Sequence, residues 1–123
     1  MAAEDLAVAN AFLETLATAA TSGDPKDVYP LLAPDVHWMT PQRDLRGVDE
    51  LANVLSWFFR EERDQIDFEI REQSDLGGGK IVTDFQEIHR ARETGEFAYA
   101  RDHRIVLTIR DGKIATYEMR FAG

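Results

Sequence analysis

Apolar residues near the start of the chain recur at steps of three and four, the spacing of one face of an α-helix. The repeat runs through Leu6, Ala9, Leu13, Leu16 and Ala20. Acidic residues at positions 4 and 5 favour the positive N-terminal end of such a helix, and Gly23 is a typical stop signal. The pattern therefore predicts an amphipathic helix that ends at Gly23.

A second, shorter helix is predicted over residues 24–32. Asp24 and Pro25 suit its N-cap and its first turn. Pro30 should break or kink it, because proline lacks the amide hydrogen that a helix needs. We therefore expect a short or kinked element here.

A short strand and a third helix follow. Residues 33–35 form a turn, and the alternation over residues 36–40 predicts the strand. Apolar positions over residues 48–59 predict the helix, with Trp57 at the edge of its apolar face and more typical of a core than of a ligand-binding surface. The charged residues 60–64 are expected to form its solvated end.

Four strands fill the second half of the chain. Alternating residues and glycine-containing turns place them at residues 66–71, 80–92, 97–110 and 113–121. Helices followed by a run of strands predict the α+β class. We expect three N-terminal helices packed on one face of a mainly antiparallel sheet.

The face of this sheet that should be buried changes from apolar to ionisable along its length. Its apolar members are Val36, Trp38, Ile81, Phe85, Ile105, Leu107, Ile109, Tyr117, Met119 and Phe121. The same alternation places Thr40 inward at the end of the short strand. Carried along the two long strands toward the turn near residue 95, it also places polar and aromatic residues inward: Glu87, His89, Tyr99, Arg101 and His103.

The pairing between the two long strands depends on the length of the turn that joins them. If the loop is Thr94–Glu96, His89 lies opposite Arg101 and Glu87 lies opposite His103. A five-residue loop puts Glu87 opposite Arg101 instead. Either register gathers the ionisable groups into a compact cluster.

Ionisable groups on a buried face need an explanation, because an unpaired buried charge is strongly destabilising. Such groups must be paired, hydrated or used in function. We therefore predict a cavity whose polar end carries the candidate catalytic residues Glu87, His89, Arg101 and His103. Its substrate-binding wall is predicted to consist of Trp38, Thr40, Phe85, Tyr99, Tyr117 and Met119.

Two structural explanations stay open at this point. In the first, the long hairpin extends beyond the helices and both of its faces are hydrated. In the second, Glu87 and Arg101 are only an ion pair, and the two histidines are satisfied neighbours. His37 has the outward parity and is expected on the surface.

Composition narrows the possible partners. The 123 residues fit a single domain over residues 1–123. The formal net charge of −9 repels phosphate backbones and anionic membranes, so neither nucleic acid nor a membrane is expected as a partner. The chain has no cysteine, which excludes disulfides and thiolate chemistry.

The start of the chain does not read as a targeting signal. Glu4 and Asp5 stand where a signal peptide needs Lys or Arg. No apolar run approaches the roughly 18 residues of a membrane span. A small domain without cysteine suits the cytoplasm, which is the expected location.

Three stretches resemble a known superfamily: DPKDVYPLLAPDVHWMTP, LRGVDELANVLSWFF and VLTIRDGKIATYEMRF. Together with the element order, they are similar to the nuclear transport factor two-like superfamily, in the branch of SnoaL-like polyketide cyclases, ketosteroid isomerases and limonene epoxide hydrolases. The resemblance covers essentially the whole chain. It implies a cystatin-like α+β barrel, in which helices and a curved sheet form a conical cavity. It also implies a homodimer through the outer face of the sheet.

The known active sites of that branch do not carry over. The positions that match the general-base Asp, the oxyanion-hole Asp and the first-helix Tyr of ketosteroid isomerases hold Thr40, Ile105 and Leu16. The Asp-Arg-Asp set of limonene epoxide hydrolases falls on Glu87, Phe85 and Met119, and their water-positioning Tyr and Asn fall on Trp38 and Thr40. The resemblance therefore supports neither of these known reactions, and any chemistry in this chain would depend on a different set of polar residues.

Two functions fit that polar set. The first is an acid–base enzyme without a cofactor, of the isomerase, cyclase or dehydratase type, acting on a small apolar or semi-polar ligand with a carbonyl, hydroxyl or epoxide. Histidine would be its acid or base, Glu87 would orient it, and Arg101 would stabilise a developing enolate or alkoxide. The alternative is a ligand-binding or dimeric assembly module without turnover.

A metal site is not expected. Glu87, His89 and His103 form a two-histidine, one-carboxylate set. However, Arg101 beside them would repel a cation.

Overall fold

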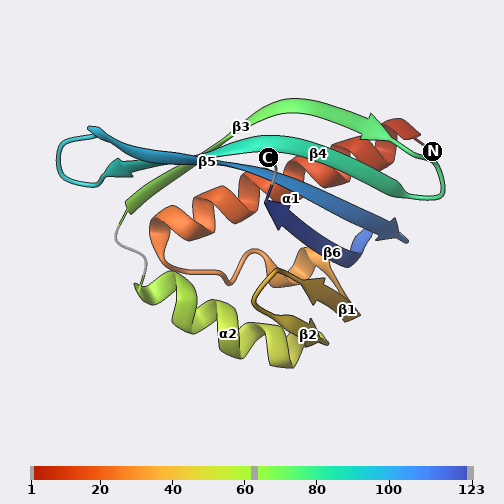
Figure 1. Cartoon of the computed structure of the whole chain (residues 1–123). Coiled ribbons are helices and arrows are strands. Elements are labelled where there is room, and N and C mark those ends of the chain that lie inside the picture. The colour runs from red at the N-terminus through yellow and green to blue at the C-terminus, as the bar shows by residue number, and fades with distance from the viewer. Residues whose placement is uncertain (1, 62–63, 122–123) are drawn as a thin grey trace.

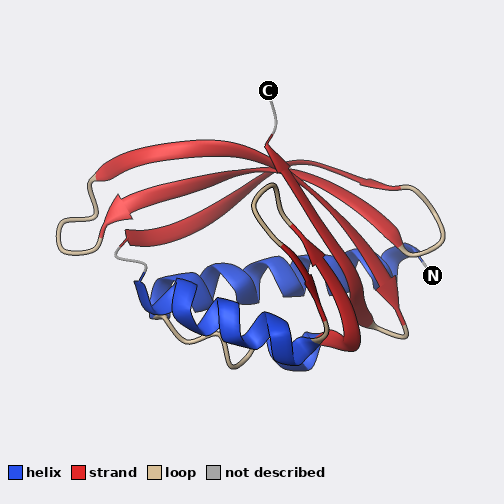
Figure 2. Cartoon of the chain, turned by 60° about the horizontal axis from the view of Figure 1, so that its bottom comes forward, coloured by secondary structure: helices blue, strands red, loops and turns tan. Residues whose placement is uncertain are grey.

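The structure is a computed structural model that describes residues 2–61 and 64–121. It has two layers, a curved sheet and two α-helices beneath it (Figure 1). The helices are α1, Ala2–Ser22, and α2, Val48–Glu61. Both helices lie against the same face of the sheet, as the second view makes plain (Figure 2). This arrangement confirms the α+β class.

The sheet has six strands in the order β2-β1-β6-β5-β4-β3. Their bounds are β1 Leu32–Met39, β2 Asp44–Arg46, β3 Asp64–Asp75, β4 Lys80–Ala91, β5 Phe97–Arg110 and β6 Lys113–Phe121. Every pair is antiparallel except β1 with β6. The sheet is therefore mainly antiparallel, as the sequence predicts.

The prediction of three helices is wrong at the second one. Only a single 3-10 turn forms there, at Tyr29–Leu31. Asp24 caps a local turn, since its Oδ1 accepts the amide hydrogen of Lys26 at 3.0 Å. Pro25 and Pro30 stand only five positions apart, so too few amide donors lie between them to build an α-helix.

Three other boundaries differ from the predictions. The expected turn at residues 33–35 is part of β1, and the short edge strand β2 was not predicted. The predicted solvated helix end, residues 60–64, includes two positions outside the described residues. Its last member, Asp64, is not helical but begins β3.

The inward parity of the long strands is confirmed. Ile81, Thr83 and Phe85 are buried on β4, and the alternation continues to a buried His89. On β5, His103 is buried in line with the apolar positions that follow it. The core therefore lies between the helices and this sheet face, and it gives way to ionisable side chains toward the β4–β5 turn.

The β4–β5 turn selects one of the two possible registers. Five residues separate Ala91 from Phe97, and Glu87 pairs with Arg101. His89 then faces Tyr99 across the ladder, and Phe85 faces His103.

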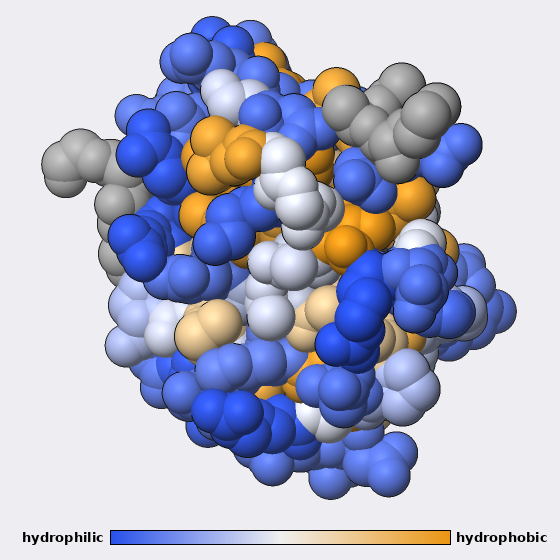
Figure 3. Space-filling view, turned by 90° about the vertical axis from the view of Figure 1, so that its right-hand side faces the viewer, coloured by the Kyte–Doolittle hydropathy of each residue, from blue (hydrophilic) through white to orange (hydrophobic). Residues whose placement is uncertain are grey.

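The surface is mostly hydrophilic, with smaller hydrophobic patches between charged residues on the side shown in Figure 3. This mostly hydrophilic surface agrees with the strongly acidic composition. Within residues 2–61 and 64–121, no helix is both long and apolar enough to cross a membrane.

Candidate functional site

A cavity of about 470 Å³ lies under the sheet, between the ends of both helices, the β1–β2 loop and the strands β3 to β6. All ten predicted site residues line it: Trp38, Thr40, Phe85, Glu87, His89, Tyr99, Arg101, His103, Tyr117 and Met119. Its size is within the roughly 300–1,000 Å³ of small-molecule sites. The structure therefore places all the side chains that the parity argument selected around one cavity.

The apolar floor of the cavity is a stack of two rings. Trp38 and Tyr117 are register partners on β1 and β6, and their rings are parallel at 3.6 Å between centroids. Phe12 of α1 meets both rings edge-on. The hydroxyl of Tyr117 donates a hydrogen bond to Sδ of Met119 at 3.7 Å. Burial, with a further contribution from the charge of Glu87, raises the pKa of Tyr117 far above its usual range.

The polar end of the cavity is organised around one carboxylate. Oε2 of Glu87 lies 2.7 Å from Nε2 of His89 and 3.7 Å from Nε2 of His103. The first separation is a hydrogen bond, and the second is an ion-pair distance. Both imidazoles are almost fully buried, whereas the Glu87 side chain is 23% exposed.

His89 has a carboxylate on each side. Its Nδ1 lies 3.0 Å from Oδ2 of Asp64, and its Nε2 faces Glu87. Each ring nitrogen therefore faces a carboxylate oxygen, and neither nitrogen is open to a substrate.

The electrostatics of Glu87 follow from these neighbours. Burial alone would raise the pKa of its carboxyl. The contacts with His103 and His89 act in the opposite direction and prevail, so the pKa of Glu87 lies below its ordinary value. Glu87 is therefore an anion at neutral pH, and it orients both imidazoles.

Arg101 lines the cavity but is not part of this inner cluster. It forms no ion pair with its register partner Glu87 among the described side chains, so the simple ion-pair explanation fails. Its guanidinium lies 5.2 Å from the ring centre of Tyr99. The Tyr99 ring in turn stacks on His89 at 4.2 Å. An aromatic ring thus separates Arg101 from the buried cluster.

The explanation that both faces of the long β4–β5 hairpin are hydrated applies only to its tip. Phe97 is 63% exposed and Tyr99 is 39% exposed, but His89 and His103 are each 3% exposed. The inner half of the hairpin therefore lies under the cover of the helices and the β1–β2 loop.

Sequence reasoning missed or misplaced several residues of the site. Asp64 was assigned to a helix end, although it shares the parity of Ile66 and Phe68 and so faces inward. Trp57 was expected in the core, but it is 53% exposed and lines the cavity. Gln42 and Arg43 also line it, since the turn between β1 and β2 bends over the cavity. The hydroxyl of Thr40 stabilises that turn by accepting the amide hydrogens of both.

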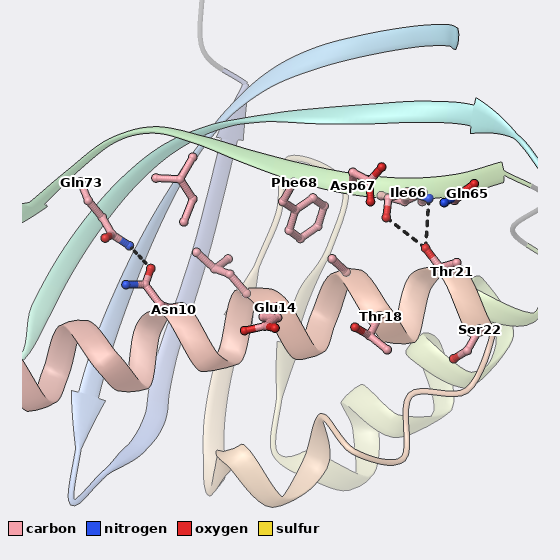
Figure 4. Close-up of a pocket in the computed structure, with 13 residues that line it drawn as sticks. Asn10, Glu14, Thr18, Thr21, Ser22, Gln65, Ile66, Asp67, Phe68 and Gln73 are labelled. Atoms are coloured by element: carbon pink, nitrogen blue, oxygen red, sulfur yellow. Dashed lines mark hydrogen bonds between the residues drawn. The ribbon is translucent and has the colours of Figure 1, made fainter. Parts of the chain in front are cut away.

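Two other features of the structure bear on possible sites. Within the described residues, no group of three or more His, Asp and Glu side chains is placed to hold a metal ion. A second hollow lies between α1 and β3 and is lined mainly by polar side chains (Figure 4). There the hydroxyl of Thr21 bonds both backbone groups of Ile66, at 3.1 Å from N and 3.0 Å from O. This contact satisfies the free edge of β3 rather than forming a site.

Comparisons with known proteins agree with this architecture. A family model described as a SnoaL-like domain matches residues 11–117, while no curated protein sequence matches the chain. The structure is similar to an NTF2-like protein from Anabaena variabilis ATCC 29413, with a TM-score of 0.78 and 16% identity, over 98% of this chain and 90% of that one.

Two further solved structures are similar. One is an LEH-like epoxide hydrolase from M. tuberculosis, with a TM-score of 0.74 and 18% identity, over 98% of this chain and 84% of the other. The other is a protein with a ketosteroid isomerase-like fold from Catenulispora acidiphila DSM 44928, in complex with trimethylamine. Its TM-score is 0.67 at 12% identity, over 90% of this chain and 85% of that one. At these identities the likeness shows a shared fold.

Proposed function

The chain belongs to the SnoaL-like domain family, and on that basis we propose that it is a small-molecule enzyme that performs acid–base chemistry without a cofactor. One observation carries the proposal. A single ionised carboxylate, Glu87, lies in a largely apolar cavity and contacts two buried imidazoles, His89 and His103. That combination provides a proton acceptor, a group that orients it, and apolar walls around both.

His103 is the proposed general base. His89 is less suited because both of its nitrogens face carboxylates. His103 would take a proton from a carbon next to a carbonyl group, and the electron pair of that C–H bond would move to the carbonyl oxygen as an enolate. In an isomerisation, the enolate is conjugated with a double bond, and His103 returns the proton to the far carbon of that system. In a cyclisation, the enolate carbon attacks a second carbonyl, and the resulting alkoxide takes the proton back from His103. Both reactions fit a semi-polar substrate in this cavity.

Binding without turnover is the second candidate. It is favoured by the mutual pairing of Asp64, His89 and Glu87, which would stabilise the hairpin even if no reaction took place. The neighbour with a ketosteroid isomerase-like fold was crystallised with a small molecule, trimethylamine, which supports ligand binding in either case.

We further propose that the protein is a homodimer through the outer face of the sheet. The outward positions of β4 and β5 combine small and apolar residues with ion pairs, and they include Val82, Ile88, Ala98, Ala100 and Val106. Asp84 and Arg104 on this face form a two-point ion pair, at 2.7 and 3.0 Å. Such a mixed surface suits contact with its own copy about a two-fold axis.

The catalytic proposal is tested by deuterium exchange. In D2O, the protein should accelerate exchange of the protons next to the carbonyl of small cyclic ketones, with 2-tetralone as the reference, followed by proton NMR. His103→Ala should lower the enzymatic rate about 10²–10⁴-fold. His37→Ala is the matched control, since His37 pairs with Asp44 outside the cavity.

The outcomes separate the two candidates. If the cluster is only structural, His103→Ala should reduce the free energy of unfolding by about 1–3 kcal/mol, while ligand affinity changes little. Absence of any exchange above background across the ketones would contradict the catalytic proposal.

A further inference from the structure

The mouth of the cavity has a charge opposite to that of the whole protein. The chain carries a net charge of −9, yet among the described residues that line the cavity the one carboxylate is Glu87, together with Arg43, Arg101 and two histidines. An acidic protein that places two arginines at one opening creates a local site for an anion, because beyond about 8 Å the remaining charge is screened at physiological salt. The second hollow, beside α1, differs: its described lining includes Glu14 and Asp67 but no Lys or Arg.

Both arginines are available to a ligand. Neither Arg43 nor Arg101 forms an ion pair within the described part of the chain, and both side chains are exposed. Arg43 follows the turn at the tip of the β1–β2 hairpin, and Arg101 is held over the Tyr99 ring. Guanidinium groups bind planar anions such as carboxylates with two parallel hydrogen bonds.

Aromatic rings stand next to these cations. Trp57 and Tyr99 line the same opening and are substantially exposed, while the stacked pair Trp38 and Tyr117 closes the floor. An exposed Trp beside a cavity offers a large flat apolar face, which a planar ligand could cover. The walls therefore favour a flat ring system, and the mouth favours a negative charge at one end of it.

We propose that the ligand of this cavity is a planar aromatic or conjugated anion, a carboxylate or an ionised enol. Its acidic group is bound by Arg43 and Arg101, and its ring system lies along Trp57 and Tyr99. This proposal rests on the proposed function and names the substrate class of the same cavity. It also orients the ligand, since the anionic end stays at the mouth and the opposite end reaches Glu87 and His103.

The test compares three probes of nearly the same shape by isothermal titration calorimetry. They are 2-naphthoate, the neutral 2-naphthamide and the cationic 2-naphthylmethylammonium. We expect 2-naphthoate to bind most tightly and the cation most weakly. Arg43→Gln and Arg101→Gln should each weaken 2-naphthoate about three- to tenfold, the range of a partly exposed charge-assisted contact. Each should leave 2-naphthamide within about twofold.

Two controls make the result specific. Arg46→Gln removes an exposed arginine from the same hairpin that does not line the cavity, and it should leave all three probes unchanged. Trp57→Ala should weaken the binding of 2-naphthoate and of 2-naphthamide by the same factor, since contact with the Trp57 ring does not distinguish a charged probe from a neutral one. The folding of each variant is checked by its thermal melt.

Several results would overturn the inference. They are equal affinity for 2-naphthoate and 2-naphthamide, tightest binding of the cation, no binding of 2-naphthoate, or equal weakening of both probes by the arginine variants. The proposed acid–base function fails separately, because its exchange assay uses a neutral ketone. Loss of exchange in His103→Ala together with equal probe affinities would retain the function and reject the anionic ligand.

Discussion

Nδ1 of His89 lies 3.0 Å from Oδ2 of Asp64 on the neighbouring strand. Asp64 is the first residue of β3, and His89 is near the end of β4. Glu87 completes the row on the other side of the imidazole. The row runs from a partly exposed carboxylate to the wall of the cavity, so the orientation of the His89 ring depends on a residue outside the cavity lining.

Asp64→Asn should destabilise the protein by about 1–3 kcal/mol, because the buried His89 loses one of its two anionic partners. The substitution preserves the shape of the side chain, so the effect reports the charge. Urea denaturation measures it. Asp67→Asn is the matched control: it lies on the same strand, is exposed, and stands 4.0 Å from Arg90, so it should change stability by less than about 0.5 kcal/mol. Equal effects of the two variants would contradict the role of Asp64.

Acid should weaken the fold through Glu87. The pKa of its carboxyl in the folded protein lies below the ordinary value of 4.5, so below that pH the unfolded chain takes up the proton first. The stabilisation is therefore complete above about pH 4.5 and is lost as the pH falls through the folded pKa. Denaturation from pH 6 to pH 3 should show this loss, with a shallower slope for Glu87→Gln.

The control for the acid series is Asp84→Asn. Arg104 lowers the pKa of Asp84, which gives the same sign of pH dependence. However, this pair lies on the outer face of the sheet, where solvent and salt screen it. Glu87→Gln should therefore remove more of the pH dependence than Asp84→Asn, and the reverse order would show that the cavity cluster does not dominate.

The alternation of side chains was enough to predict most of the site. Glu87, His89 and His103 interrupt an apolar inward face, and a strand offers only two directions for each side chain. Asp64 followed the same rule but was overlooked, because the charged run before it resembled a helix end. Trp57 and Arg43 could not be placed this way, since their positions depend on how α2 and the β1–β2 turn pack over the sheet.

Two features of the fold could not be predicted from the sequence: the length of the turn between the long strands, and the absence of the second helix. A hairpin register depends on one or two loop residues, so the sequence left Glu87 opposite either His103 or Arg101. The second helix failed because local signals at Asp24 and Pro25 are the same for a helix and for a turn. Only the short distance to Pro30 decides between them.

Gly79→Ala should be more damaging than Gly78→Ala. Both glycines have positive φ, +81° and +64°, so both substitutions strain the backbone. At Gly79, however, an added Cβ would also lie 2.3 Å from the carbonyl oxygen of Ile109, whereas at Gly78 nothing lies within 4 Å. The clash should add at least about 1 kcal/mol. Thermal melts of the two variants measure the difference, and equal losses would mean that the β3–β4 turn moves freely away from β5.

The outer sheet face should hold two copies of the chain together. Light scattering at micromolar concentration should give twice the 14.0 kDa mass of one chain, and a monomer mass would reject the dimer. Ala100→Glu should convert the protein to a monomer, because Ala100 is a small residue on that face, opposite Ile88 of β4, where a dimer would bury the new charge without a partner. Ala11→Glu, on the exposed side of α1, adds the same charge elsewhere and should leave the dimer intact. If both variants dissociate it, general repulsion in this acidic protein is the cause. If neither does, the copies meet through another surface.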